Sequence, residues 1–202
     1  TLPKPDNEFV KHISKYKLDS HLKTTVNDYG TILCGTNKQR VKLNNAVRRI
    51  LNRNTRLPQA DDKVICTRNN GKNNYVIFNG DIFYVKKPMT HVNQHKGIEL
   101  TDYIMLNEED TDFIKVVVDD DVWHNGYSKH NFIDEAVDGE GDLTRIFLDR
   151  FDFAYAITVW KAQGSEYDNV LFVDEDVSFF VDRAKFRYTA VTRSKNLLTI
   201  AK

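Results

Sequence analysis

Residues 155–166 read Tyr-Ala-Ile-Thr-Val-Trp-Lys-Ala-Gln-Gly-Ser-Glu, and residues 188–195 read Tyr-Thr-Ala-Val-Thr-Arg-Ser-Lys. Both stretches lie in a region where short apolar runs alternate with a helical segment. Residues 151–157 and 170–173 predict strands, residues 182–194 predict a helix, and residues 197–201 predict a closing strand. Strands that alternate with helices are typical of a parallel sheet. This part of the chain is therefore expected to be an α/β domain.

A further strand, turn and helix are predicted nearer the N-terminus. Residues 31–35 form a short apolar run, and Thr36 followed by Gln39 has the spacing of a helix-capping box. Apolar residues then recur at helical intervals, at Leu43, Ala46, Val47, Ile50 and Leu51. In an α/β sheet such a turn lies at the carboxyl edge, where ligands bind. Residues 1–30 are expected to be a lead-in segment, with a helix around residues 7–17.

The middle of the chain has a different pattern. Short runs at 63–67, 75–78, 82–85 and 113–118 predict strands, and Asn79-Gly80 between two of them is a strong signal for a type I′ hairpin. The stretch from 138 to 142, Asp-Gly-Glu-Gly-Asp, predicts an exit loop. Residues 61–150 are therefore expected to form a β domain inserted into the α/β domain, which comprises residues 31–60 and 151–202.

Composition restricts the class of protein. At 202 residues with 41 % apolar content, the chain can fold into one large or two small globular domains. It contains neither an apolar run of membrane-spanning length nor a secretory signal. Cys34 and Cys66 both lie in predicted strands, so we expect reduced core thiols. These features predict a soluble protein of the cytoplasm, or one encoded by a virus and acting in the host cytoplasm.

Charge is balanced but segregated. The chain has 29 basic and 29 acidic residues, which argues against indiscriminate binding of phosphate through a broad positive field. Residues 38–56 hold seven basic side chains and no acid, whereas residues 102–142 hold thirteen acids and two lysines. A path for nucleic acid is expected to avoid the acidic stretch.

The two stretches quoted first resemble motifs V and VI of superfamily 1 helicases, in the right order. Residues 158–166 are similar to the motif V of the RecD/Dda-like branch, Thr-Val-His-Lys-Ala-Gln-Gly-Ser-Glu, except that Trp160 replaces the histidine. Residues 36–40, Thr-Asn-Lys-Gln-Arg, resemble motif IV. The resemblance covers most of the chain from residue 31. It implies a RecA-like (P-loop NTPase type) domain, called 2A, with an inserted SH3-like β-barrel, called 2B, at residues 61–150.

The resemblance also implies residue roles on the nucleotide side. Arg193 matches the motif VI arginine that reaches into the ATP site, and such an arginine is worth about a thousandfold or more in rate. Arg40 is the candidate for the nucleotide-facing arginine of motif IV. Gln163 and Gly164 belong to the part of motif V that brings backbone close to the γ-phosphate, and Glu166 matches an acid that accepts from the ATP ribose hydroxyls.

On the nucleic-acid side, the family uses the first residues of motif V to contact the backbone of a single strand. Thr158 occupies the threonine position of that motif. Trp160 has an indole N–H donor and a face on which a base can stack, worth about 1–3 kcal/mol; the alternative is a tryptophan packed against another domain. Lys161 either contacts phosphate or is simply solvated.

A glycine-rich phosphate loop is missing from the sequence. No Gly-x-x-x-x-Gly-Lys-Ser/Thr stretch occurs, so the chain cannot hold the β- and γ-phosphates in that way. Together with the start at Thr1, this absence predicts the second half of a longer helicase. ATP and Mg²⁺ are expected to be bound mainly by the absent N-terminal RecA-like domain.

No metal site is expected within this chain. Residues 170–175, Val-Leu-Phe-Val-Asp-Glu, imitate a magnesium-binding Walker B strand but come after motif V, so we expect a buried strand that ends in solvated acids. His91 and His95 lack a cysteine partner and lie between Pro88 and Gly97, which indicates a loop rather than a zinc site.

The sequence therefore predicts the C-terminal motor domain of an ATP-dependent 5′–3′ DNA helicase. Its expected partners are single-stranded DNA, with RNA less favoured, the N-terminal RecA-like domain, and a protein of replication or recombination, without a membrane. Two alternatives remain open: the C-terminal domain of a viral RNA helicase, and a non-catalytic module that binds nucleic acid or a partner within a helicase–nuclease complex.

Overall fold

The computed structural model describes residues 2–6, 8–27, 30–72, 75–95, 98–107, 111, 113–125, 130, 132–136, 143–177 and 182–202. The chain divides into two compact units, which are considered separately. The first unit consists of Thr1–Asn54 together with Tyr155–Lys202, and the second unit is Thr55–Ala154. The inserted domain predicted from the sequence spans 61–150, within the second unit.

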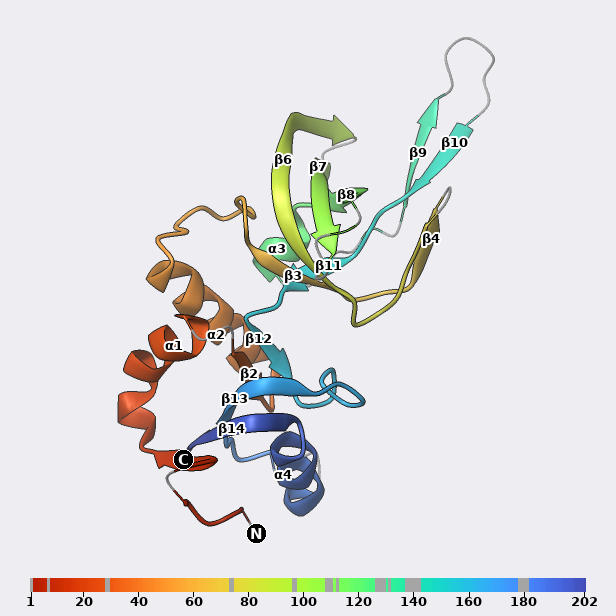
Figure 1. Ribbon diagram of the computed structural model, residues 1–202. Coiled ribbons are helices and arrows are strands. Elements are labelled where there is room, and N and C mark those ends of the chain that lie inside the picture. The colour runs from red at the N-terminus through yellow and green to blue at the C-terminus, as the bar shows by residue number, and fades with distance from the viewer. Residues whose placement is uncertain are drawn as a thin grey trace. The chain divides into compact units, whose positions relative to one another are not determined.

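The first unit is built on a parallel sheet (Figure 1). Its strands follow the order β1-β14-β13-β2-β12, and every neighbouring pair is parallel. The strand bounds are β1 Val10–Ile13, β2 Thr31–Cys34, β12 Ala156–Thr158, β13 Tyr167–Val173 and β14 Ser194–Ala201. The predicted α/β class with a parallel sheet is confirmed.

Helices cover the two faces of this sheet. Side chains alternate between the faces of a strand, and Leu171 and Val173 of β13 pack in the same apolar cluster as α1 (Leu18–Asn27) and α2 (Asn37–Ile50). Phe172 points the other way, and its ring lies 5.4 Å from that of Phe186 on α4 (Arg183–Val191). Figure 1 shows α1 and α2 on one side of the sheet and α4 on the other.

The start of α2 follows the predicted capping pattern. Thr36 has extended backbone angles, and its side-chain oxygen accepts a hydrogen bond of 3.2 Å from the amide of Gln39. This contact satisfies one of the amides that a helix leaves unpaired at its N-terminus. The cap fixes the direction in which α2 leaves the edge of the sheet.

The N-terminal segment contributes a strand to the sheet, which the sequence did not indicate. The helix predicted around residues 7–17 is wrong: Val10–Ile13 form β1, followed by a short 3₁₀ turn at Lys15–Lys17 and then α1. Val10 pairs with Leu198 of β14 in parallel register. The open edge of β14 offers hydrogen bonds that a weak local helical pattern cannot match.

The second unit is a β structure. Its main sheet has the order β11-β3-β6-β7-β8, with antiparallel neighbours throughout. These strands are β3 Lys63–Cys66, β6 Ile82–His95, β7 Ile98–Asn107, β8 Phe113–Asp119 and β11 Phe151–Phe153. Two further pairs are β4 Asn70–Lys72 with β5 Tyr75–Ile77, and β9 Phe132–Ala136 with β10 Leu143–Phe147; α3 spans Asp121–Asn125.

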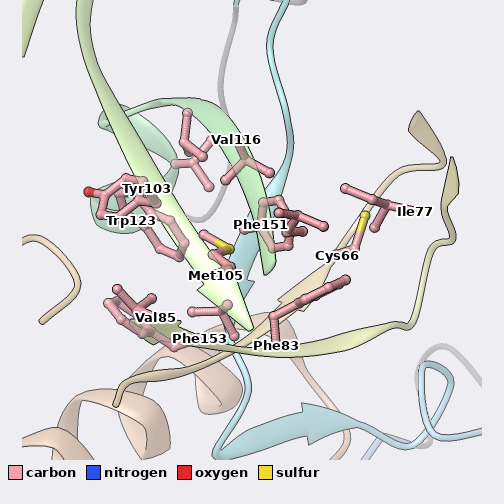
Figure 2. Close-up of a cluster of buried hydrophobic side chains, with 14 residues drawn as sticks. Cys66, Ile77, Phe83, Val85, Tyr103, Met105, Val116, Trp123, Phe151 and Phe153 are labelled. Atoms are coloured by element: carbon pink, nitrogen blue, oxygen red, sulfur yellow. The ribbon is translucent and has the colours of Figure 1, made fainter. Parts of the chain in front are cut away.

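An aromatic cluster forms the core of this second unit (Figure 2). Trp123 lies between Tyr103 and Phe153, with ring centroids 5.7 and 5.2 Å away, and Phe83 packs edge-on against Phe151 at 5.8 Å. Such aromatic pairs add stability beyond the apolar area that they bury. The unit therefore has its own hydrophobic core, while its more specific assignment as an SH3-like barrel stays a prediction.

The Asn79-Gly80 turn is formed, but the predicted hairpin is wrong. Gly80 has φ 109°, but Asn79 does not have the positive φ that a type I′ turn also requires. In addition, β5 does not pair with β6. It pairs with β4, whereas β6 lies between β3 and β7 in the main sheet. Cys66 explains this choice, because its backbone bonds both to the amide of Gly80 and to the carbonyl of Asp81. Long-range pairing with β3 therefore replaced the local strand partner.

Candidate nucleotide and nucleic-acid site

The motif V segment runs from the side of the sheet where the strands end, here called the carboxyl edge, toward the side where they begin, here called the amino edge. It begins at the carboxyl end of β12, where the amide of Val159 donates to the carbonyl of Cys34 at 2.9 Å. It ends at Tyr167, the first residue of β13. Because β12 and β13 are parallel, the loop starts at the carboxyl edge and finishes at the amino edge. The predicted site residues therefore fall into two groups.

The carboxyl-edge group holds the residues predicted to contact nucleic acid. Thr158 is buried, and its carbonyl accepts from the amides of Lys161 at 2.9 Å and Ala162 at 3.1 Å, which turns the chain sharply. The next residue but one, Trp160, is 41 % exposed. Thr158 thus supports the turn from inside, while Trp160 presents part of its indole to the surface.

Trp160 is neither free-standing nor part of the core. Its ring centroid lies 5.8 Å from that of Phe186 on α4, with the planes inclined at 41°. Phe186 in turn contacts Phe172 of β13. One part of the indole is therefore held against α4, and the exposed part can meet another molecule. Both roles considered for this residue are compatible with this position.

The second group, toward the amino edge, holds the residues predicted to contact the nucleotide; it adjoins the first, because the amide of Gln163 donates to the carbonyl of Trp160 at 3.3 Å. Gln163, Gly164 and Glu166 are all exposed. Gly164 has φ 91°, a left-handed conformation that side chains disfavour, and a Cβ added there would meet no atom of this chain within 4 Å. Its backbone is therefore open to an approaching ligand. The carboxylate of Glu166 lies 3.8 Å from the Lys195 ammonium, in an exposed ion pair.

Arg193 lies at the same edge, immediately before β14. Its guanidinium donates from Nη1 to the carbonyl of Ser165 at 2.8 Å, from Nε to the carbonyl of Thr189 at 3.1 Å, and from Nη2 to Thr192 Oγ1 at 3.1 Å. Its own carbonyl accepts from the amide of Tyr167 at 2.8 Å. Motif VI is therefore tied to the last residues of motif V by both backbone and side chain.

Arg40 lies apart from Arg193. It belongs to the first turn of α2, which follows the carboxyl end of β2, and is only 5 % exposed. Its Nε donates to Asn37 Oδ1 at 3.3 Å. The structure therefore brings together Arg193, Gly164 and Glu166 at the amino edge and leaves Arg40 at the carboxyl edge with Thr158 and Trp160.

Sequence reasoning misjudged the surroundings of the two acids that follow β13. The prediction that this strand ends in solvated acids is wrong, because Asp174 and Glu175 are both engaged with other elements. Asp174 is buried and accepts from Arg187 Nε at 3.0 Å and Nη2 at 2.5 Å. Arg183 adds a second cation 3.5 Å away. The spacing of the two arginines, four residues apart on one helix, was the available signal.

Glu175 closes the turn between β2 and α2. Its carboxylate accepts from the backbone amides of Gly35 and Thr36 and from Thr36 Oγ1 at 2.8 Å. A helix N-terminus is a ready site for an anion, and here the protein's own carboxylate fills it. A larger residue at position 35 would crowd this arrangement, because an added Cβ would lie 2.5 Å from Val177 Cγ1 and 3.2 Å from the Glu175 carboxylate.

The remaining titratable features are structural. Burial raises the pKa of the Cys34 thiol to about 12, so it stays protonated at neutral pH; Cys34 and Cys66 are both buried. Across the described ranges, no group of three histidine, cysteine or carboxylate side chains is arranged to hold a metal. The side chains of His91 and His95 lie outside the described residues. No helix in the described part of the chain is long and apolar enough to cross a membrane.

The family comparison matches the segment that carries this site. Residues 153–201 match the model of the UvrD-like helicase C-terminal domain. That range includes the whole motif V loop, α4, Arg193 and β14. No significant similarity to a curated protein sequence is found.

Solved helicase structures share the fold. The Bacteroides Pif1 structure bound to single-stranded DNA aligns with a TM-score of 0.52 at 14 % identity, over 85 % of this chain and 40 % of that one. Bacteroides Pif1 helicase in complex with ADP-AlF3 and single-stranded DNA aligns with a TM-score of 0.52 at 15 % identity, over 94 % and 46 %. The chain thus spans less than half the length of these helicases. Residues 153–201 therefore match the UvrD-like helicase C-terminal domain, and the chain shares the fold of these helicase structures.

Proposed function

We propose that the first unit is the second motor domain of an ATP-dependent DNA helicase of the RecD/Dda-like type. The observation that carries this proposal is the contact between Arg193 and Ser165. It joins motif VI to the end of motif V at the amino edge of the sheet, beside the open backbone of Gly164. A nucleotide bound at this edge would meet an arginine, an exposed amide segment and a carboxylate together.

Each residue of this group has a distinct task in ATP hydrolysis. Arg193 stabilises the negative charge that develops on the γ-phosphate as it departs, because its guanidinium is a cation. Since it is supplied from a neighbouring domain, it acts only when the two domains close. Gly164, with Gln163 beside it, lets backbone approach the phosphates without a side chain between. Glu166, which is 62 % exposed, accepts from the ribose hydroxyls.

The carboxyl-edge group contacts the single strand. Thr158 shapes the turn, Trp160 offers the exposed part of its indole for base stacking, and Lys161 offers a cation for phosphate. The related Bacteroides Pif1 structures contain single-stranded DNA, which favours DNA over RNA. The two groups share one loop of motif V, so a change at the nucleotide edge can be transmitted to the strand. The 5′–3′ direction is proposed from the motif resemblance.

ATP and its Mg²⁺ would be held mainly by an N-terminal RecA-like domain. The sequence has no phosphate loop, and its described residues offer no cluster of three metal ligands. ADP-AlF3 in one Bacteroides Pif1 structure supports nucleotide binding in related proteins. Arg40, the motif IV candidate, is only 5 % exposed and lies at the carboxyl edge, away from the Arg193 group, so no nucleotide contact is proposed for it. The wider partner is a protein of replication or recombination.

The function can be tested on the complete protein that contains this chain. We expect single-stranded DNA to stimulate ATP hydrolysis more than RNA of the same sequence, and duplexes with a 5′ tail to be unwound in preference to those with a 3′ tail. Greater stimulation by RNA would favour the RNA helicase alternative. Absence of any ATP hydrolysis would favour the non-catalytic module.

The role of Arg193 needs a separate measurement. Arg193→Ala is expected to lower kcat for ATP about a thousandfold, because the lost contact belongs to the transition state. Affinity for single-stranded DNA should stay within about threefold of the wild type, since a kcat effect of this kind leaves ground-state binding intact. The matched control is Lys185→Ala, which removes an exposed cation on α4. Normal turnover of Arg193→Ala would refute the arginine-finger assignment.

A further inference from the structure

Asp174 lies where three elements of the first unit meet. It follows β13 directly, and its amide donates to the carbonyl of Ala201 in β14 at 2.9 Å. Its carboxylate is almost fully buried, with 3 % of the side chain exposed. Both carboxylate oxygens face α4, where Arg187 binds one with Nε and the other with Nη2. The carboxylate is therefore a fixed point of the sheet to which α4 is attached.

Glu175, the next residue, fixes the end of β13 to the turn between β2 and α2. Glu175 bonds to the amides of Gly35 and Thr36 and so ties the end of β13 to the start of α2. Consecutive acids thus point to opposite partners, as successive side chains of an extended segment do. Asp174 cannot move toward α4 without disturbing the β2–α2 turn.

The bidentate geometry fixes α4 in direction as well as in position. A guanidinium that donates two parallel bonds to a carboxylate has a defined plane, unlike a lysine, which binds as a point charge. Asp174 also raises the pKa of Arg187 above its ordinary value, chiefly through the hydrogen bonds to its carboxylate. The pair is therefore held in one arrangement.

Arg193 depends on the far end of the same helix. α4 is nine residues long and ends at Val191. The Nε of Arg193 donates to the carbonyl of Thr189, two residues beyond Arg187, and its Nη2 donates to Thr192 at the helix end. A tilt of α4 about the Arg187–Asp174 contact, at the middle of the helix, would move these acceptors together with the backbone of Arg193.

We propose that Asp174 and Arg187 are positioning residues for Arg193: they anchor α4 to the end of β13 and thereby set where the guanidinium stands at the amino edge. The proposal rests on the proposed role of Arg193 in ATP hydrolysis. Neither residue touches the nucleotide. Their effect on turnover is transmitted through α4 alone.

The test is a double-mutant cycle in the complete protein, measured by steady-state ATP hydrolysis with saturating single-stranded DNA. Asp174→Asn keeps the size of the side chain and removes the charge, and we expect kcat to fall about tenfold or more, as small misplacements of a catalytic group do. In the Arg193→Ala background, the same change should lower kcat by less than about twofold, because the residue through which it acts is gone. The control is Asp168→Asn, at an exposed carboxylate near the start of β13.

Arg187→Lys is the second variant, because it keeps the charge and cannot bind both carboxylate oxygens in one plane. We expect it to lower kcat in the wild-type background and to have little effect in the Arg193→Ala background. It therefore replaces Asp174→Asn if that variant folds poorly, and thermal melting of each variant checks folding. Normal kcat for both variants, or a loss that multiplies with that of Arg193→Ala, would overturn the positioning role alone. Normal kcat for Arg193→Ala itself would instead overturn the proposed function, and the positioning role with it.

Discussion

The guanidinium of Arg193 donates a hydrogen bond of 2.8 Å from Nη1 to the backbone carbonyl of Ser165, which lies 28 residues earlier in the chain. The bond crosses between the strands β13 and β14 at their amino ends and joins the two helicase motifs into one surface. A carbonyl carries only a partial negative charge, so a phosphate would compete with it effectively. The bond therefore holds the arginine in place on its own unit, and under the proposed function a phosphate would replace the carbonyl as its partner.

We expect the isolated 202-residue chain neither to hydrolyse ATP nor to bind it tightly. It holds Arg193 and Glu166 but no phosphate loop, and contacts to the ribose and γ-phosphate alone leave most of the triphosphate in water. The measurement is phosphate release with single-stranded DNA present, alongside binding of a fluorescent ATP analogue. Robust turnover by this chain would contradict the prediction.

Gly164→Ala should reduce ATP use through the backbone rather than through a clash within the chain. The strain of an alanine at φ 91° is expected to cost about 1–2 kcal/mol of stability. If the backbone of Gly164 approaches the nucleotide, KM for ATP should also rise in the complete protein. Gly80→Ala is the matched control, since Gly80 has φ 109° and equally open surroundings in the second unit. An equal change in KM for the two variants would argue against a nucleotide contact.

Trp160→Ala is expected to weaken binding of single-stranded DNA more than Trp160→His does. Alanine removes both the stacking face and the polar donor, a loss of about 1–3 kcal/mol, whereas histidine keeps a ring and a donor. Fluorescence anisotropy with a labelled oligonucleotide measures this order. The control is Tyr16→Ala, which removes a fully exposed aromatic ring elsewhere in the first unit. Unchanged affinity with a lower melting temperature would mean that Trp160 serves only to pack against Phe186.

The stability of the second unit should depend on pH through Asp120. The pKa of Asp120 is raised from 3.8 to about 6, chiefly by burial; a hydrogen bond from Thr101 acts to lower it, and the carboxylates of Glu99 and Asp119 contribute smaller increases. Because the folded-state pKa is the higher one, this group's contribution to stability is fully present below pH 4 and is lost as the pH rises through 6.

Asp120→Asn removes that dependence. We expect the variant to be more stable than the wild type at pH 7.5, by on the order of 1–3 kcal/mol, and the difference to shrink below pH 5. Urea unfolding at several pH values measures the difference. Asp121→Asn, at the adjacent exposed carboxylate, should give a small difference that changes little with pH. A stability gain for Asp120→Asn that is the same at all pH values would exclude titration of Asp120 as its cause.

Local patterns along the sequence were enough to determine the α/β class, the strands β2, β13 and β14 and the capped start of α2. The run predicted as one strand at 151–157 instead divides into β11 of the second unit and β12 of the first. Each correct prediction depends on residues a few positions apart: the apolar spacing of Leu43 and Val47 decides a helix face, and Thr36 caps the helix that follows it. Motifs V and VI could also be recognised in the sequence, because the residues of each motif are consecutive in the chain. Such features are set by near neighbours, so no knowledge of the fold was needed.

Pairing between distant segments was decided only by the tertiary structure. Val10 forms a strand because β14 has an open edge. The chain after Gly80 pairs with β3 because the backbone of Cys66 forms hydrogen bonds with Gly80 and Asp81. The sequence presents Asp174 and Glu175 as two acids after an apolar strand, with nothing to say that arginines of α4 and amides before α2 surround them. A charged group is buried only where the folded chain supplies partners from elsewhere, and which partners those are is a property of the fold.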